Sequence, residues 1–279
     1  MNYSEMLKNL TARQEEMQRF LPLSKIEAME LEKNIRIEHV WSSNAIEGSS
    51  LNRYETASIL NTGMTIGKVP ITEILAALDL SNAYDYMVDL VNRKQPLTVT
   101  TIRDLNRLVM SKNSTERSAA GNYRNIDVWP NGREDHPYTN PLDVPFEVDK
   151  LVAWANKAKE ELHPVQYAAD LHYRFVTIHP FIDGNGRTAR LLMNFALTQA
   201  KYPVINIQPD KDSRTKYMEA LAHAQDTGDL KPFEKLVANY TLSTLDQRIE
   251  ILRRNEKNMK LAQQQTVLFR KPKPKGRER

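Results

Sequence analysis

The stretch HPFIDGNGRTAR, residues 179–190, combines residues that end helices with residues that bind anions. Pro180 stops any helix that enters the stretch, because proline lacks a backbone N–H and clashes with the preceding turn. Gly184 and Gly186 permit backbone conformations and close approaches that other residues do not. A new helix is expected to start near Asn185, so its unpaired N–H groups should face the loop. The stretch therefore predicts a tight, ligand-binding turn between two helices.

The side chains of this turn suit phosphate chemistry. Free N–H groups and the positive pole of a helix attract anions. Arg187 and Arg190 lie three residues apart, so they share a helix face and offer guanidinium forks to phosphate. Asp183 is a hard oxygen ligand for Mg²⁺, and His179 can accept a proton from a hydroxyl. Each residue alone is more often structural, but together they predict a phosphoryl- or nucleotidyl-transfer site.

Most of the remaining chain has helical patterning. Ser24 and Glu27 have the spacing of a capping box, and the helix that they begin should stop at Gly48. Apolar residues at i, i+3, i+4 spacings predict helices near residues 71–78, 102–109 and 148–155, a buried helix over 165–178, and later helices over 186–200, 214–225 and 231–252. We therefore expect an all-α fold.

Residues 121–140 differ from this pattern. Ile126, Asp127 and Val128 alternate in polarity before the turn-like sequence Pro130-Asn131-Gly132. Alternation followed by a turn is typical of a β-hairpin. A lone hairpin is marginally stable in water, so we expect it to lean on the helices as a flap.

Composition points to a soluble protein without a membrane partner. The chain has 279 residues, is 41% apolar and 27% charged, and contains no cysteine, which together suit a reducing compartment. The N-terminal residues lack a signal-like apolar segment, and no apolar run is long enough to span a bilayer. We therefore expect a cytoplasmic protein. The last ten residues carry a charge of +5, which leaves −1 for the other 269, so nucleic acid is an unlikely partner.

Residues 179–190 resemble the signature of the Fic family, HPFx[D/E]GNGRxxR, at every defined position. The resemblance extends over about residues 70–245 and includes Gly121-Asn122-Tyr123-Arg124. It implies a Fic-type helical bundle with a small hairpin. It also divides the chain into an N-terminal helical region (1–69), a catalytic domain (70–245), and a C-terminal helix with a basic tail (246–279).

Most members of this family transfer AMP from ATP to a protein hydroxyl with Mg²⁺. The resemblance implies that His179 deprotonates a Ser, Thr or Tyr of the target, and that Asp183 holds Mg²⁺. It implies ATP-phosphate contacts for the loop and the helix that follows, namely Gly184, Asn185, Gly186, Arg187 and Arg190. Ile126 and Val128 on the flap would align the target, and Tyr217 would line the adenine pocket. Self-modification and a homodimer stay open.

The family also has an inhibitory helix motif, [S/T]xxxE[G/N]. Within SSNAIEGSS, residues 42–50, Ser43, Glu47 and Gly48 match it. An acid at a helix C-terminus is unfavourable by roughly 0.3–1 kcal/mol. We expect this cost to be offset by a bidentate pair between Glu47 and Arg190, with Ser43 supporting the helix by hydrogen bonding. The sequence therefore predicts an adenylyltransferase that inhibits itself by occupying the arginine for the γ-phosphate.

The same residues leave room for other functions. Removal of AMP, with Glu47 positioning water, is an alternative for the same site. Relatives that transfer phosphate or phosphocholine exist, but phosphate-transferring ones lose part of the GNGRxxR motif. A non-catalytic interaction or nucleic-acid-binding protein would not need base, metal ligand and anion loop together. A P-loop is excluded because residues 63–69 have the wrong spacing, and no HExxH zinc motif occurs.

Overall fold

The computed structural model describes residues 2–112, 119–130 and 133–269, with side chains described up to residue 261. This part of the chain contains ten α-helices. The first five are α1 (Tyr3–Gln18), α2 (Lys25–Ile46), α3 (Arg53–Thr62), α4 (Ile71–Asn92) and α5 (Val99–Val109). The others are α6 (Val144–Glu161), α7 (Pro164–Ile178), α8 (Asn185–Gln199), α9 (Lys211–Thr227) and α10 (Lys231–Phe269).

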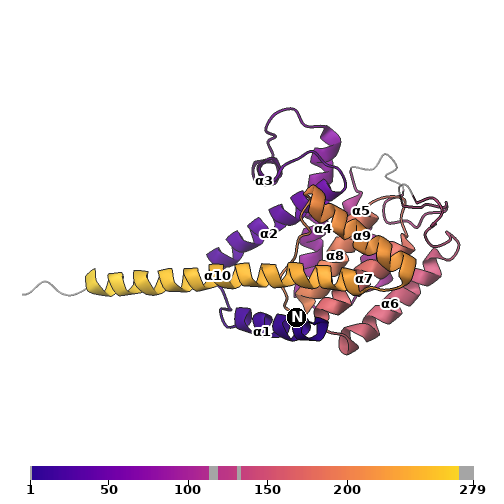
Figure 1. The fold of residues 1–279 in the computed structure, drawn as a ribbon. Helices are drawn as coiled ribbons and strands as arrows, with labels where there is room; N and C mark the ends of the chain where they lie inside the picture. The colour runs from indigo at the N-terminus through magenta and orange to yellow at the C-terminus, as the bar shows by residue number, and fades with distance from the viewer. Residues whose placement is uncertain (1, 113–118, 131–132, 270–279) are drawn as a thin grey trace, which may run out of the picture.

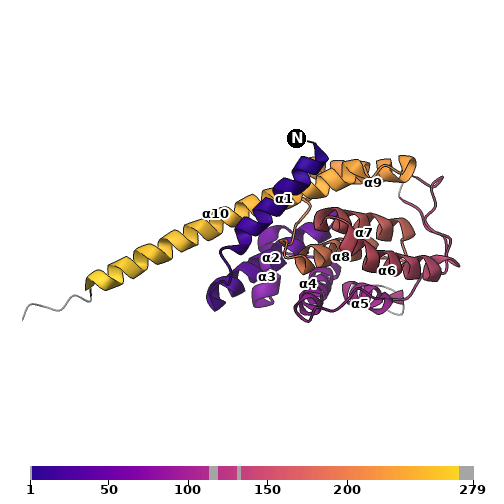
Figure 2. The same cartoon turned by 90° about the horizontal axis from the view of Figure 1, so that it is seen from below.

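The helices form layers around α7 and α8 (Figures 1 and 2). Seen from below, α1, α9 and α10 lie on one side of this central pair, and α4 and α5 lie on the other. Residues 187–197 of α8 are all buried, because neighbouring helices cover every side of it. A helix buried all round must be largely apolar, and Arg187 and Arg190 are the charged exceptions on α8.

The predicted helices are confirmed, and α2 begins and ends where the sequence predicts. The capping box at Ser24 is present, with the Glu27 N–H donating to the Ser24 hydroxyl and the Ser24 N–H donating to the Glu27 carboxylate. The same helix ends at Ile46, followed by Glu47 as its C-cap and by Gly48 at a φ of 100°. The last predicted helix is longer than expected, since α10 runs on to Phe269 and projects from the body (Figure 1).

The helix α2 has two different halves. Its N-terminal half exposes Ile26 and Met29, whereas most of its C-terminal half, from His39 to Ile46, is buried. That buried half packs against α4 and α8, which places the predicted inhibitory motif beside the start of α8. The sequence periodicity of α2 is weak because only one half of it faces a core.

The predicted β-hairpin is wrong for the described part of residues 121–140, where no strand forms. One backbone hydrogen bond crosses the loop, from the Tyr138 N–H to the Val128 carbonyl (3.1 Å). The guanidinium of Arg124 donates hydrogen bonds to the carbonyls of Ile126 and Thr139. In a hairpin, the backbone N–H groups of a facing strand would donate to such carbonyls. Three residues of alternating polarity are too few to predict a hairpin reliably, because one long-range side chain such as Arg124 can bind the same backbone groups. Asn131 and Gly132 of the expected turn lie outside the described residues, as does the basic tail from residue 270.

Within the described residues, every helix is too short or too polar to cross a bilayer.

An asparagine on α8 holds the extended segment that follows this helix. The buried side chain of Asn194 donates to the Ile205 carbonyl and accepts from the Ile205 N–H, each at 2.9 Å. Asn194→Ala would leave both backbone groups buried without partners, so we expect the free energy of unfolding to fall by about 2–4 kcal/mol. Urea denaturation measures this. The exposed helical Asn34 is the matched control, and Asn34→Ala should change stability by less than about 0.5 kcal/mol. An equal effect of both substitutions would contradict the role of Asn194.

Candidate active site

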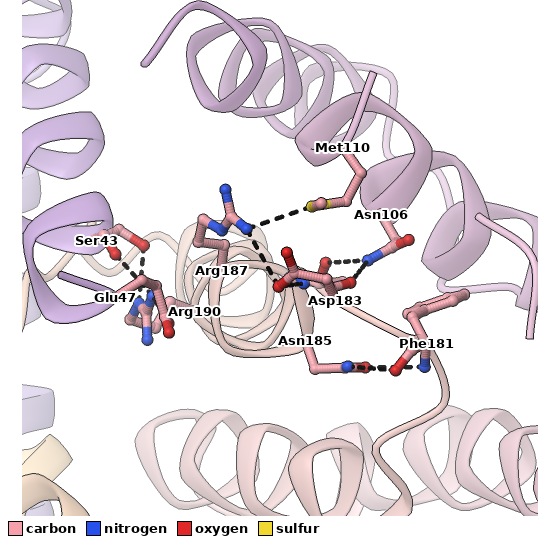
Figure 3. Close-up of polar contacts among 11 residues, drawn as sticks. Ser43, Glu47, Asn106, Met110, Phe181, Asp183, Asn185, Arg187 and Arg190 are labelled. Atoms are coloured by element: carbon pink, nitrogen blue, oxygen red, sulfur yellow. Dashed lines mark hydrogen bonds and ion pairs between the residues drawn. The ribbon is translucent and has the colours of Figure 1, made fainter. Parts of the chain in front are cut away.

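The turn between α7 and α8 is built around its own backbone. His179 ends α7 in the left-handed region with a φ of 50°, and Gly184 precedes α8 with a φ of 77°. The Asn185 side chain locks the turn, accepting from the Phe181 N–H (3.1 Å) and donating to the Phe181 carbonyl (2.7 Å) (Figure 3). The Phe181 ring is buried in the core, as expected of an anchor. The turn therefore has a defined shape before any ligand binds.

A second support comes from α5 and was missed by the sequence analysis. The Asn106 amide donates to the Asp183 carbonyl (2.9 Å), and its oxygen accepts from the Gly121 N–H (2.9 Å). A side chain at Gly184 would lie 2.9 Å from Met110 and 3.0 Å from Asn106, so this position needs glycine. Asn106 lies more than seventy positions before the loop, and no local pattern marks it.

The first turn of α8 gathers groups that can bind an anion. The earliest backbone hydrogen bond of the helix runs from the Thr188 N–H to the Gly184 carbonyl, so the N–H groups just before it lack helical acceptors. Arg187 is buried beside them, where its Nη2 lies 3.3 Å from Met110 Sδ and 3.5 Å from Asp183 Oδ1. Its Nε has no hydrogen-bond partner among the described residues. A buried donor without a partner in this position suits an anionic ligand.

The carboxylate of Asp183 points away from the core, with 64% of its side chain exposed (Figure 3). The described residues hold no cluster of three His, Cys, Asp or Glu that could cage a metal. Mg²⁺ needs no such cage, since it is usually held by one or two carboxylates together with phosphates and water. The Asp183 donor set therefore fits a magnesium ion that arrives with a nucleotide.

Arg190 is only 3% exposed and is bound by the end of α2 (Figure 3). Its Nη2 lies 2.6 Å from Glu47 Oε1 and 2.8 Å from the Ser43 carbonyl, and its Nε donates to the Ser43 hydroxyl at 2.8 Å. The expected bidentate pair is therefore wrong: only Nη2 meets the Glu47 carboxylate, and Ser43 accepts from this same nitrogen and from Nε. Ser43 also differs from expectation, because it binds Arg190 directly.

The charges at this contact stabilise one another. Loss of hydration disfavours the charged form of both groups, although 39% of the Glu47 side chain stays exposed, and Arg190, by its charge and hydrogen bond, lowers the pKa of Glu47 below its usual range. Burial acts in the same unfavourable sense on Arg190, and Glu47 outweighs it and raises the pKa of the guanidinium. Glu47 is therefore ionised at neutral pH, and the contact is an ion pair.

Two further residues hold the end of α2, and neither was anticipated. The Arg214 side chain of α9 donates to the Ile46 carbonyl (2.9 Å), which satisfies one of the last acceptors of α2. The Glu73 carboxylate of α4 accepts from the N–H groups of Ser50 (2.7 Å) and Leu51 (3.2 Å). The carboxylate of Glu47 also lies where a side chain at Gly186 would be, so the glycine permits the approach.

His179 is covered on one face by an aromatic ring. Tyr138 stacks on it with ring centroids 4.0 Å apart and planes 14° from parallel. Burial lowers the pKa of His179 to about 4, and the nearby Arg124, which donates to the His179 carbonyl (2.7 Å), acts in the same direction. The imidazole is therefore neutral at pH 7 and able to accept a proton. Tyr138 was missed because nothing in its local sequence points to the histidine.

The flap residues and Tyr217 are the remaining predicted site residues, and their surroundings differ. The Val128 carbonyl accepts a hydrogen bond from the N–H of Tyr138, the residue whose ring covers His179. The Ile126 side chain is exposed. Tyr217 is 2% exposed, and its hydroxyl lies 2.9 Å from Nε2 of the buried His172. Tyr217 is therefore a buried residue that lies beside Arg190, with which its hydroxyl also interacts.

Comparisons with known proteins agree with this geometry. Residues 96–197 match the Fic/DOC family. Among curated proteins, the chain is 38% identical over 217 residues to the protein adenylyltransferase Fic of Aedes aegypti and 37% identical to that of Culex quinquefasciatus. In each case the match covers 77% of this chain, which spans 42% of the length of the relative.

Two solved structures share the fold at 26% identity. A fragment of Fic-1 from C. elegans superposes with a TM-score of 0.79, covering 90% of this chain and 74% of that one. A Fic domain containing signaling protein from Bacteroides thetaiotaomicron also gives a TM-score of 0.79, covering 88% of this chain and 98% of that one. The resemblance thus extends beyond residues 96–197 to most of the described helices.

The lowered pKa of His179 has a measurable consequence. Because the folded state favours the neutral imidazole of His179, the free energy of unfolding is not reduced by this residue at pH values above its ordinary pKa of about 6.5. As the pH falls from about 6.5 toward about 4, the free energy of unfolding decreases by up to about 1.4 kcal/mol per pH unit, because the unfolded chain binds a proton that the folded chain does not. NMR titration of the folded protein should show His179 titrating well below 6.5, and His179→Ala should flatten this part of the stability profile. A folded-state pKa at or above 6.5 would show that burial does not control this histidine.

Proposed function

Since the chain belongs to the Fic/DOC family, we propose that it transfers AMP from ATP to a Ser, Thr or Tyr hydroxyl of a target protein. The observation that carries the proposal is the turn at residues 179–190, which joins a neutral histidine, a solvent-exposed carboxylate and a helix start suited to anions. The name shared by the curated relatives, protein adenylyltransferase, supports it. Because the chain spans less than half of those relatives, their activity comes to it as a proposal. We also propose the division into residues 1–69, 70–245 and 246–279.

The chemistry follows from the geometry of the turn. His179 accepts the proton of the target hydroxyl, whose oxygen attacks the α-phosphorus of ATP. The bond between the α-phosphorus and the bridging oxygen breaks, and pyrophosphate leaves. His179 can act as the base because its imidazole is neutral at pH 7, although the burial that lowers its pKa to about 4 makes it a weaker base than a free histidine. Val128 and Ile126, on the loop that carries Tyr138, align the target segment beside the base.

The phosphates are bound by the start of α8. Its free N–H groups around Asn185 and Gly186 stabilise negative charge that develops during transfer. Arg187 binds the β-phosphate through nitrogens such as the unpartnered Nε, and Arg190 binds the γ-phosphate. Asp183 would hold Mg²⁺, which would supply positive charge to the phosphates. Tyr217 is a weaker candidate for the adenine pocket, since its side chain is buried and its hydroxyl faces His172.

The end of α2 inhibits the transfer. Arg190 cannot bind a γ-phosphate while its Nε and Nη2 are held by Ser43 and Glu47. ATP then binds in a pose without its γ-phosphate contact, which misplaces the α-phosphate for in-line attack. A misplacement of about 1 Å can reduce the rate about 10²-fold.

Release of Arg190 should activate the protein. Glu47→Gly is expected to raise AMP transfer severalfold, up to about 10²-fold, because it frees the guanidinium. Mass spectrometry of protein targets, or of the chain itself, after incubation with labelled ATP measures the gain. Glu47→Gln tests the charge alone and should give an intermediate gain. Glu38→Gln is the matched control, because Glu38 lies on the same helix but pairs with Arg53. Unchanged transfer in both Glu47 variants would refute the inhibition.

Loss of the base should separate binding from chemistry. In the Glu47→Gly background, His179→Ala is expected to abolish AMP transfer while calorimetry still finds ATP binding with little change in affinity. The reason is that the phosphates are bound by α8 and its arginines. His136→Ala, on the exposed part of the neighbouring loop, is the control and should keep full transfer. Transfer that persists in His179→Ala would assign the base elsewhere.

A further inference from the structure

A cavity of about 320 Å³ lies between α6 and α7 and has no role in the reaction described above. Its size is at the small end of the range for ligand pockets, about 300–1,000 Å³. The walls combine aromatic, aliphatic and charged groups, chiefly Trp154, Tyr173, Arg174, Leu151, Ile178 and Thr139. Such a mixture can take a side chain that is apolar along its length and charged at its tip.

The cavity lies next to the proposed base along two separate segments. Ile178, which lines it, directly precedes His179. Thr139, which also lines it, directly follows Tyr138, whose ring stacks on His179 at 4.0 Å. An extended peptide advances about 3.3 Å per residue. A target whose hydroxyl reaches His179 can therefore place a side chain in the cavity from a position two or three residues away.

The charge of the cavity is positive. Glu147 and Lys150 at its edge pair with each other at 2.8 Å, so they leave little net charge. Arg174 stacks over the Trp154 ring at 4.3 Å, and the one described carboxylate that lines the cavity, Glu147, pairs with Lys150 instead. Asp170, one turn earlier on α7, is the nearest acid by sequence and feels the charge of Arg174, but it is buried beside Glu234 on α10 and forms no ion pair with the guanidinium. The exposed guanidinium therefore remains available to a ligand.

We propose that this cavity binds an acidic side chain of the target segment, two or three residues from the modified hydroxyl. The carboxylate pairs with Arg174, and the methylene groups lie against Trp154 and Tyr173. This inference rests on the proposed transfer to a protein target and assigns a sequence preference to it. The aromatic walls would also accept a phenylalanine, but a stacked arginine without a carboxylate partner favours an anion.

A peptide panel tests the preference in the full-length Glu47→Gly protein. Each peptide carries one threonine, serine or tyrosine, with Glu, Gln, Lys or Phe placed at single positions up to three residues away. AMP incorporation from ATP is measured by mass spectrometry, and binding by the anisotropy of fluorescein-labelled peptides. We expect Glu to lower KM about tenfold relative to Gln at one or two positions, with kcat little changed, as for a charge-assisted hydrogen bond.

Variants connect the preference to the cavity. Arg174→Gln should raise the KM of Glu peptides to that of Gln peptides while leaving ATP affinity and labelling of Gln peptides unchanged. Arg174→Lys should keep part of the preference, which excludes a folding defect as the cause. Arg93→Gln, which removes an exposed arginine of α4, is the matched control and should have no effect.

The outcomes distinguish this inference from the proposed function. Equal binding of Glu and Gln peptides, or a preference that survives Arg174→Gln, overturns the acidic site. A preference for Phe that is independent of Arg174 also overturns it and assigns the cavity to an aromatic side chain. If Glu peptides bind through Arg174 but none is labelled, the docking site stands and the AMP transfer fails instead.

Discussion

The pairing of Arg190 with the end of α2 is the interaction on which the site depends. A buried guanidinium without a partner is strongly destabilising, so α8 can carry Arg190 in the core only if something meets it. Ser43 and Glu47 supply that partner from a helix more than 140 positions away. Since the Glu47 side chain is 39% exposed, water can reach the same place when the carboxylate is absent. The arrangement therefore combines a buried charge with a partner at the surface, as the proposed exchange of Glu47 for a phosphate on Arg190 requires.

The proposed anion site is formed in advance because the turn at residues 179–190 is held from several sides. Asn185 closes the turn internally, and Asn106 ties it to α5. The glycines allow neighbours to approach the backbone closely. A methyl group at Gly184 would collide with Asn106 and Met110, and one at Gly186 would collide with Glu47. Preorganised donors need little reorganisation when a phosphate binds, which is the main way that proteins stabilise charge in such reactions.

The sequence predicted the helices well because their signals are local. The capping box at Ser24 and the glycine at residue 48 lie next to the ends that they define. The hairpin failed for the opposite reason: Arg124 reaches across the loop to the carbonyls of Ile126 and Thr139, and that contact replaces a strand pair. Asn106, Tyr138 and Arg214 were missed in the same way, because each acts on a residue far from it along the chain.

The sequence by itself determined the chemical groups of the site and their order on one turn, because proline, glycine and helix-start preferences act over a few residues. It also identified Glu47 as a partner for Arg190. Only the tertiary structure decided the form of that contact, in which Ser43 takes two of the three hydrogen bonds and Glu47 takes one. It alone also decided that Tyr138 covers His179 and that a cationic cavity lies beside it. Such contacts depend on how distant helices pack, and packing follows from the burial of whole helix faces, which no short motif encodes.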